Sequence, residues 1–158
     1  MSDDHAIRRE GFLENGTYLL RRRVSWGECD AAGIVYTPRF LEWMVTTIEQ
    51  FFHEVLQSPW ETLRNRGLAS PFVSTTLAFQ APIRVGEDLE LVLRVGNIGR
   101  TSVGWLIGGR VAERDCFAGT ATTVFVGIAS EAPTRIPENL LLLLRRRPTP
   151  HLAGTASE

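Results

Sequence analysis

The sequence is short of cysteine, of net charge and of long apolar runs, and each shortage excludes a class of protein. Two cysteines, Cys29 and Cys116, cannot form the disulfide framework of a small secreted domain, so we expect a reduced, cytoplasmic protein. The formal net charge of −1 provides no basic surface field for nucleic acid. The longest aliphatic run, Leu140 to Leu144, is far too short to cross a membrane.

Histidine is also scarce, and this limits the chemistry of the site. The three histidines are His5, His53 and His151, and none of them is close to Cys29 in the sequence. A thiol without a neighbouring base is more typical of a small buried side chain than of a nucleophile. No group of histidine, cysteine and acidic residues has the spacing of metal ligands. The sequence therefore predicts neither a Cys–His nucleophile nor a metal site.

The chain of 158 residues suits one domain, and its two ends differ in composition from its middle. Residues 1–14 are a polar stretch that we expect to form a flexible arm. Residues 145–158, "RRRPTPHLAGTASE", are typical of a disordered tail. Residues 15–144 are therefore predicted to form a single domain.

A long helix is predicted from Thr37 onward. Thr37 is a typical N-cap residue, and Pro38 favours the first helical position. Apolar residues then recur at helical spacing, and polar residues occupy only a narrow side, so we expect the helix to be largely enclosed. The recurring apolar residues are Phe40, Met44, Ile48, Phe51 and Val55.

Alternation with a period of two predicts strands on both sides of this helix. A first strand is expected over residues 17–26. Strand-like alternation returns at 73–85, at 89–95 and at 103–107, and a last strand is expected over 116–128. Short turns join the last four strands, which indicates antiparallel neighbours. One helix laid against one antiparallel sheet satisfies the burial, so the predicted fold class is α+β.

The segment between the first strand and the helix reads "GECDAAGIVYTPRFLEW". It resembles the active-site segment of the 4-hydroxybenzoyl-CoA thioesterase family of hotdog-fold proteins, and the resemblance extends over about residues 17–138. It implies a hotdog fold in which a five-stranded antiparallel sheet wraps one long helix. The positions that fit the family pattern are Gly27, Glu28, Cys29, Asp30, Ala32, Gly33, Ile34, Val35, Tyr36 and Pro38.

The resemblance implies that Asp30 is the catalytic aspartate, acting as nucleophile or as general base. The backbone N–H of Thr37 would bind the thioester oxygen, because amides at a helix N-terminus lack partners within the helix. Gly33 would let the backbone approach the substrate closely. The alternative role for Asp30 is a cap of the turn. The competing acid, Glu28, is expected to be an exposed charge.

The resemblance also implies substrate contacts outside the turn. Tyr36 precedes the helix, Glu42 and Thr46 lie on its polar side, and Ser74 and Thr75 begin the strand that would face the aspartate of a second subunit. For Glu42 and Thr46 the alternative is a solvated or interfacial polar side chain, and for Ser74 and Thr75 it is ordinary strand composition. A guanidinium group binds phosphate through paired hydrogen bonds. The arginines that we expect near the phosphates of coenzyme A are Arg100 and Arg135, and for each of them a plain surface charge is the alternative.

The sequence therefore predicts an acyl-CoA thioesterase that hydrolyses an aromatic, short-chain or medium-chain acyl-CoA. No cofactor is expected, because coenzyme A is part of the substrate. One alternative is a module that binds acyl thioesters without hydrolysing them, and another is a hotdog hydroxyacyl-thioester dehydratase, which the lack of a nearby histidine disfavours. Apolar positions exceed what one helix can cover, so we expect a homodimer with shared sites, paired into a tetramer. Neither a nucleic acid nor a membrane is expected as a partner.

Overall fold

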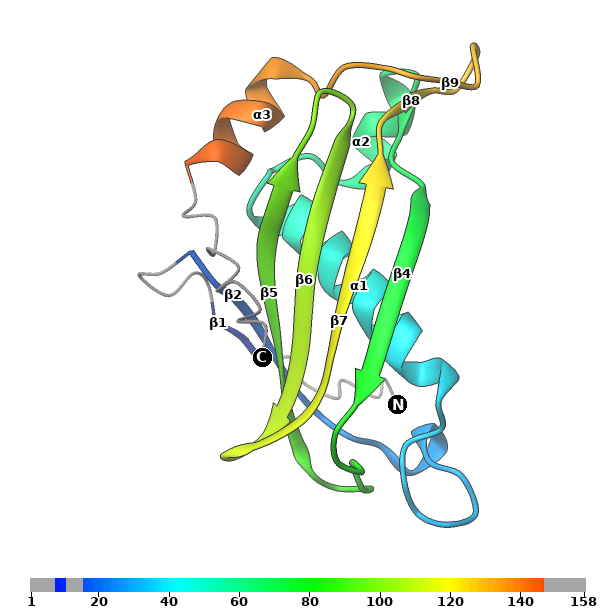
Figure 1. Cartoon of the computed structure of the whole chain (residues 1–158), viewed down its shortest axis with the longest axis vertical. Helices are drawn as coiled ribbons and strands as arrows, with labels where there is room; N and C mark the ends of the chain where they lie inside the picture. The colour runs from blue at the N-terminus through cyan, green and yellow to red at the C-terminus, as the bar shows by residue number, and fades with distance from the viewer. Residues whose placement is uncertain (1–7, 11–15, 147–158) are drawn as a thin grey trace, which may run out of the picture.

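The computed structural model describes residues 8–10 and 16–146, and its main feature is a six-stranded antiparallel sheet (Figure 1). This confirms the predicted antiparallel α+β class. The structure differs from the expected single helix and five strands, because the described residues form three α-helices and this sheet has a sixth strand. In spatial order the strands are β1 (Arg8–Glu10), β2 (Tyr18–Arg23), β5 (Asp88–Ile98), β6 (Ser102–Val111), β7 (Arg114–Val124) and β4 (Phe72–Phe79).

The sixth strand, β1, comes from the predicted N-terminal arm. Its backbone pairs with β2 in antiparallel register, with Arg9 opposite Leu20. The rest of the predicted arm, residues 1–7 and 11–14, lies outside the described residues, as does the predicted tail from residue 147 onward.

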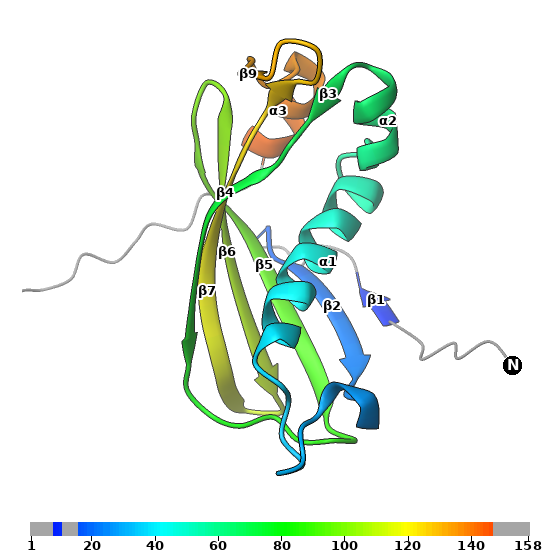
Figure 2. The ribbon, with the colours of Figure 1, turned by 90° about the vertical axis from the view of Figure 1, so that its right-hand side faces the viewer.

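The helix α1 (Pro38–Glu54) crosses one face of the sheet and supplies much of the core (Figure 2). Its buried side chains follow the predicted helical spacing, and Met44 and Phe51 have no exposed surface. The ring of Phe51 packs edge-on against Trp105 of β6, with 5.4 Å between the centroids. The helix begins at Pro38 with Thr37 as the N-cap residue, although the Thr37 side chain makes no capping hydrogen bond.

The strands differ in exposure because of their position in the sheet. In β5, Leu89 and Leu91 are buried in the core, while the residues between them face the other side. In β4 most residues are exposed, and Val73 keeps 59% of its surface in solvent. β4 lies at one edge of the sheet, and within the described residues it pairs only with β7. It ends at Phe79, earlier than the predicted residue 85, because Pro82 has no N–H with which to continue the strand pairing.

The connections contain shorter elements. The first predicted strand ends early, since β2 stops at Arg23 and a short 3₁₀ helix, η1 (Trp26–Glu28), follows. The leucine-rich run forms α3 (Glu138–Arg145), in which Leu140 and Leu144 are buried, and this helix has no counterpart among the predicted elements. The other short elements are α2 (Trp60–Asn65) and a small second sheet of β3 (Leu68–Ala69), β8 (Val126–Gly127) and β9 (Ala132–Pro133). None of the helices in the described part of the chain is long and apolar enough to cross a membrane.

Candidate functional site

A tight turn joins η1 to α1 and carries the predicted catalytic residues. The N–H of Asp30 donates to the carbonyl of Ile34 at 2.9 Å, and the N–H of Gly33 donates to the carbonyl of Asp30 at 3.0 Å. Gly33 has a φ of +74°, a conformation that strains any residue with a Cβ. The glycine is therefore needed to close the turn, which returns the chain from Asp30 to the start of α1.

The carboxylate of Asp30 is exposed and uses one oxygen locally. Its Oδ1 accepts a hydrogen bond from the N–H of Ala32 at 2.8 Å, which is the turn-capping role that was one of its two predicted roles. Among the described residues, no donor pairs with its second oxygen. Capping holds the side chain in place while this second oxygen stays available to a substrate or a water, so the two roles are compatible.

The start of α1 presents one unpaired amide, at Thr37. The N–H of Tyr36 donates to the carbonyl of Glu28 at 2.9 Å, and Pro38 has no N–H. The N–H of Arg39 donates to the carbonyl of Tyr36, also at 2.9 Å. Within residues 8–10 and 16–146 the Thr37 amide has no acceptor, and Thr37 is exposed. An exposed, unpaired amide at a helix N-terminus can stabilise a negatively charged oxygen.

A hollow of about 310 Å³ opens beside this amide. Thr37 and Phe40 line it from α1, and the segment after β4 lines it from the opposite side. Asp30 and Gly33 are not among its lining residues. The residues from the segment after β4 include one amide side chain, Gln80, which is not among the predicted site residues.

Two residues of this segment lie near the turn and are absent from the predicted site. Gln80 lines the hollow, and Arg84 forms an isolated backbone bridge with Ile34 in the turn. The only signal in the sequence is Pro82, which indicates that the chain leaves the sheet at this point. It does not indicate that the chain then meets a segment fifty residues earlier.

Glu28 is not the exposed charge that was predicted. Its side chain keeps 13% of its surface in solvent, and Arg22 of β2 forms an ion pair with it. Burial raises the pKa of this carboxyl, but hydrogen bonds from Ser25 and Trp43 and the charge of Arg22 outweigh burial, so the pKa is lowered overall. Glu28 is therefore ionised near neutral pH, and its oxygens are already occupied by donors.

Cys29 is half-buried and poorly suited to act as a nucleophile. Burial and the neighbouring charges of Glu28 and Asp30 raise the pKa of its thiol, so the thiolate is disfavoured. His53, the one histidine in the described residues, is exposed near the C-terminal end of α1. In the same part of the chain, no group of three or more histidine, cysteine and acidic residues could hold a metal ion.

The other predicted substrate contacts fall into separate environments. Ser74 and Thr75 line a hollow of about 340 Å³ between β4 and the α1 residues Leu41 and Val45. Glu42 is exposed and forms an ion pair with Arg39 at 2.6 Å. The remaining two residues are Thr46, which is partly buried, and Tyr36, which keeps 56% of its surface exposed.

The two arginines predicted for phosphate binding lie next to each other. Arg100 is in the turn between β5 and β6, and its carbonyl accepts the N–H of Ile136, the residue after Arg135. Both arginines are exposed. Figure 1 shows the β5–β6 turn at the upper end of the sheet and the turn between η1 and α1 at the lower end. Within one chain, the arginines are therefore far from Asp30.

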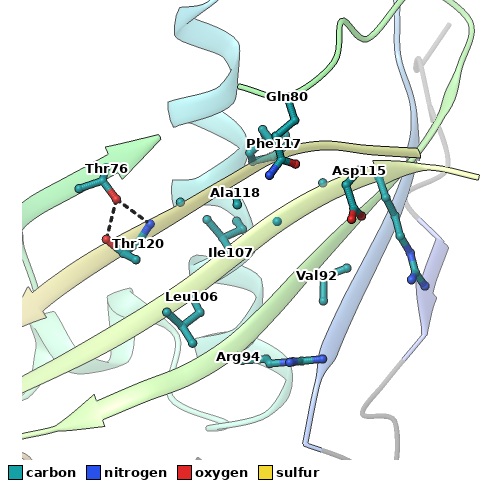
Figure 3. Close-up of a pocket in the computed structure, with 14 residues that line it drawn as sticks. Thr76, Gln80, Val92, Arg94, Leu106, Ile107, Asp115, Phe117, Ala118 and Thr120 are labelled. Carbon is teal, nitrogen blue, oxygen red and sulfur yellow. Dashed lines mark hydrogen bonds between the residues drawn. The ribbon is translucent and has the colours of Figure 1, made fainter. Parts of the chain in front are cut away.

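A further hollow, of about 550 Å³, lies mainly on the face of the sheet opposite α1. Figure 3 shows its side chains coming from the strands β4 to β7, with a hydrogen bond of 2.7 Å between the hydroxyls of Thr76 and Thr120. Its lining includes small residues such as Gly108 and Ala118. None of the predicted site residues lines it.

Comparison with known proteins places these features in a family. A family model described as the thioesterase-like superfamily matches residues 24–144. The curated 4-hydroxybenzoyl-CoA thioesterase of Pseudomonas sp. (strain CBS-3) is 32% identical over 62 residues, which are 38% of this chain and 44% of that enzyme. The matched part thus spans less than half the length of this curated relative.

Solved structures agree with this result at the level of the fold. A 1,4-dihydroxy-2-naphthoyl-CoA thioesterase from Synechocystis has a TM-score of 0.76 and 20% identity, covering 82% of this chain and 96% of its own. A thioesterase superfamily protein from Jannaschia sp. CCS1 has a TM-score of 0.78 and 23% identity, covering 89% of this chain and 96% of its own. The predicted resemblance is confirmed, and the chain belongs to the thioesterase-like superfamily.

Proposed function

We propose that this protein hydrolyses an acyl-CoA thioester to a carboxylic acid and free coenzyme A. The observation that carries the proposal is that two suitable groups lie on the same segment, between η1 and α1. Among the described residues, one oxygen of the Asp30 carboxylate has no donor, and the exposed amide of Thr37 has no acceptor. Family membership supports the same chemistry.

The two groups would act at different atoms: the Thr37 N–H at the thioester oxygen, and Asp30 at the attacking water or the carbonyl carbon. The Thr37 N–H would donate to the thioester oxygen as this oxygen becomes negative. Asp30 would either take a proton from an attacking water or attack the carbonyl carbon itself, forming a mixed anhydride that water then opens. In both routes the C–S bond breaks, the sulfur leaves as the thiolate of coenzyme A, and the proton released by water neutralises it.

An apolar acyl group would lie along α1. The hollow beside Ser74 and Thr75 shares Val45 and Phe72 with a second hollow of about 440 Å³ under α2, whose lining is mainly apolar. Such a lining suits a hydrocarbon or an aromatic ring. The relatives named for 4-hydroxybenzoyl-CoA and 1,4-dihydroxy-2-naphthoyl-CoA favour an aromatic acyl group, and a short or medium chain fits the same space.

We propose that two copies pair through β4 and share their sites. No strand of the described part of the chain pairs with the outer edge of β4, and β4 exposes Val73 and Phe79, a combination that favours pairing with another strand. Antiparallel pairing of β4 with its copy would bring the end that carries Arg100 and Arg135 beside the Asp30 turn of the partner. The arginines would then bind the phosphates of coenzyme A held at that turn. The opposite face of the sheet would join two dimers into a tetramer.

A free-thiol assay over a panel of aromatic, short-chain and medium-chain CoA esters tests the function. We expect thiol release by the wild-type protein and a loss of about 10²- to 10⁴-fold in Asp30→Asn, which lacks the reactive carboxylate. The asparagine oxygen can still accept the Ala32 N–H, so the turn should persist. The matched control, Asp88→Asn, changes an exposed carboxylate in a loose ion pair of 3.6 Å and should keep full activity.

The same panel separates the alternatives. Binding of CoA esters without thiol release would show a module that binds acyl thioesters and would contradict hydrolysis. Loss of water from a hydroxyacyl-CoA would show a dehydratase. Full activity in Asp30→Asn would remove this aspartate from the mechanism.

A further inference from the structure

The carboxylate of Glu28 joins three elements around the candidate site. Its Oε2 accepts the N–H and the hydroxyl of Ser25 at the start of η1, at 2.8 and 3.0 Å. Its Oε1 accepts the indole N–H of Trp43 of α1 at 3.0 Å and a guanidinium N–H of Arg22 of β2. All of its partners are donors, and both oxygens are used.

The partners of Glu28 are themselves held in place. Trp43 is 2% exposed and packs against Phe40 with 5.3 Å between the ring centroids. The guanidinium of Arg22 lies over the Trp43 ring, 5.0 Å from its centroid. The carboxylate is thus fixed by residues of the sheet and of α1 rather than by its own short helix alone.

The main chain of Glu28 extends this anchoring to both reactive groups. Its carbonyl accepts the N–H of Tyr36, the residue immediately before Thr37. Asp30 follows two residues later, in the turn that the Asp30–Ile34 hydrogen bond closes. A displacement of Glu28 would therefore move the Asp30 carboxylate and the Thr37 amide relative to α1.

We propose that Glu28 is a positioning residue, which sets where the Asp30 carboxylate lies relative to the Thr37 amide by tying β2, η1 and α1 together. The inference rests on the proposed thioester hydrolysis. Glu28 takes no part in proton transfer, because its oxygens are occupied by Arg22, Ser25 and Trp43. It acts through the geometry of the turn.

The test replaces Glu28 with Gln, which has the same shape but presents an NH₂ group to donors on one side. We expect kcat to fall about 10- to 100-fold, as for a displacement of about 1 Å in a reacting group, while KM stays within about threefold. The limbs of the pH–rate profile should remain in place, since Glu28 transfers no proton. Because Glu28 acts through Asp30, the E28Q/D30N double variant should be no slower than D30N alone.

The matched control is Glu90→Gln. Glu90 is also half-buried and pairs with two arginines, Arg21 and Arg110, but it lies on β5 between the buried Leu89 and Leu91, so its side chain is on the face of the sheet opposite the core. E90Q should leave kcat unchanged. A wild-type kcat in E28Q, or an equal loss in E90Q, would overturn the proposal.

A second variant and a second measurement keep the claim testable if E28Q folds poorly or if no CoA ester is hydrolysed. Trp43→Phe keeps the aromatic packing and removes one donor to Glu28, so it should lower kcat in the same direction by a smaller factor. Hydrogen–deuterium exchange should speed up over residues 28–37 in both variants and remain unchanged there in E90Q. Unchanged exchange over 28–37 in both variants would overturn the positioning role, whereas absence of thiol release by the wild type would overturn only the proposed function.

Discussion

At the residue scale, Asp30 shows how a carboxylate that caps a turn can keep one oxygen available for the proposed reaction. One oxygen accepts the Ala32 N–H and so fixes the side chain, while the second has no donor among the described residues. Thr37 makes a complementary contribution through its backbone, because the amides beside it are paired or, at Pro38, missing.

Cys29, between Glu28 and Asp30, provides a test at the same scale. Burial and the two neighbouring carboxylates raise the pKa of its thiol, so a thiolate mechanism is disfavoured near neutral pH. We expect Cys29→Ala to keep kcat within about threefold of wild type, because a protonated thiol is a poor nucleophile. Steady-state rates between pH 6 and 9 would check this. A loss of several hundredfold, in a variant with unchanged melting temperature, would point to a thiol nucleophile instead.

At the scale of elements, the periodicity of apolar residues predicts the long helix and strands that have one buried and one exposed face. The helix from Pro38 and the alternating residues of β5 follow their predicted patterns, because the pattern of burial is local to each element. β1 is three residues long and exists through its pairing with β2, so no local pattern marks it. The leucine-rich run of α3 is uniformly apolar in the sequence. Only its packing in the fold distinguishes the buried Leu140 and Leu144 from the exposed Leu142.

The candidate site likewise contains residues that the sequence predicts and residues that it does not. Asp30, Gly33 and Thr37 are close in sequence, so a short motif was enough to select them. The exposure of Glu28 was predicted wrongly because Arg22 and Trp43 reach it from two other elements. Gln80 and Arg84 were not predicted because they belong to the segment after β4, which is distant from the turn in the sequence. Contacts between distant segments are therefore what sequence reasoning could not supply here.

At the scale of the whole molecule, the positions of the Asp30 turn and of the predicted phosphate-binding arginines argue for shared sites. The Asp30 turn and the pair of Arg100 and Arg135 lie at opposite ends of the sheet (Figure 1). A single chain cannot bring them to one coenzyme A molecule at that turn without a large rearrangement. A two-fold axis between antiparallel copies of β4 would do so without any change within each chain.

Mixing of two defective variants tests this arrangement. D30N lacks the carboxylate, and the R100Q/R135Q double variant lacks both guanidinium groups. If the sites are shared, subunit exchange between the two produces dimers with one intact site, so about a quarter of wild-type activity should return at low substrate concentration. Mixing D30N with the D30N/R100Q/R135Q triple variant should restore nothing. No gain on mixing the first pair, with exchange verified by mass spectrometry, would contradict shared sites.

The most direct test of the central claim is a comparison of Thr37→Pro with Thr37→Ala. The φ of −47° at Thr37 is close to the value that proline adopts, so proline removes the amide hydrogen with little change of backbone. Alanine keeps the amide and removes only the side chain. In single-turnover hydrolysis of a CoA ester, we expect T37P to be slower by about 10²- to 10³-fold and T37A to remain close to wild type. A folded T37P protein that hydrolyses the ester at the wild-type rate would contradict the account.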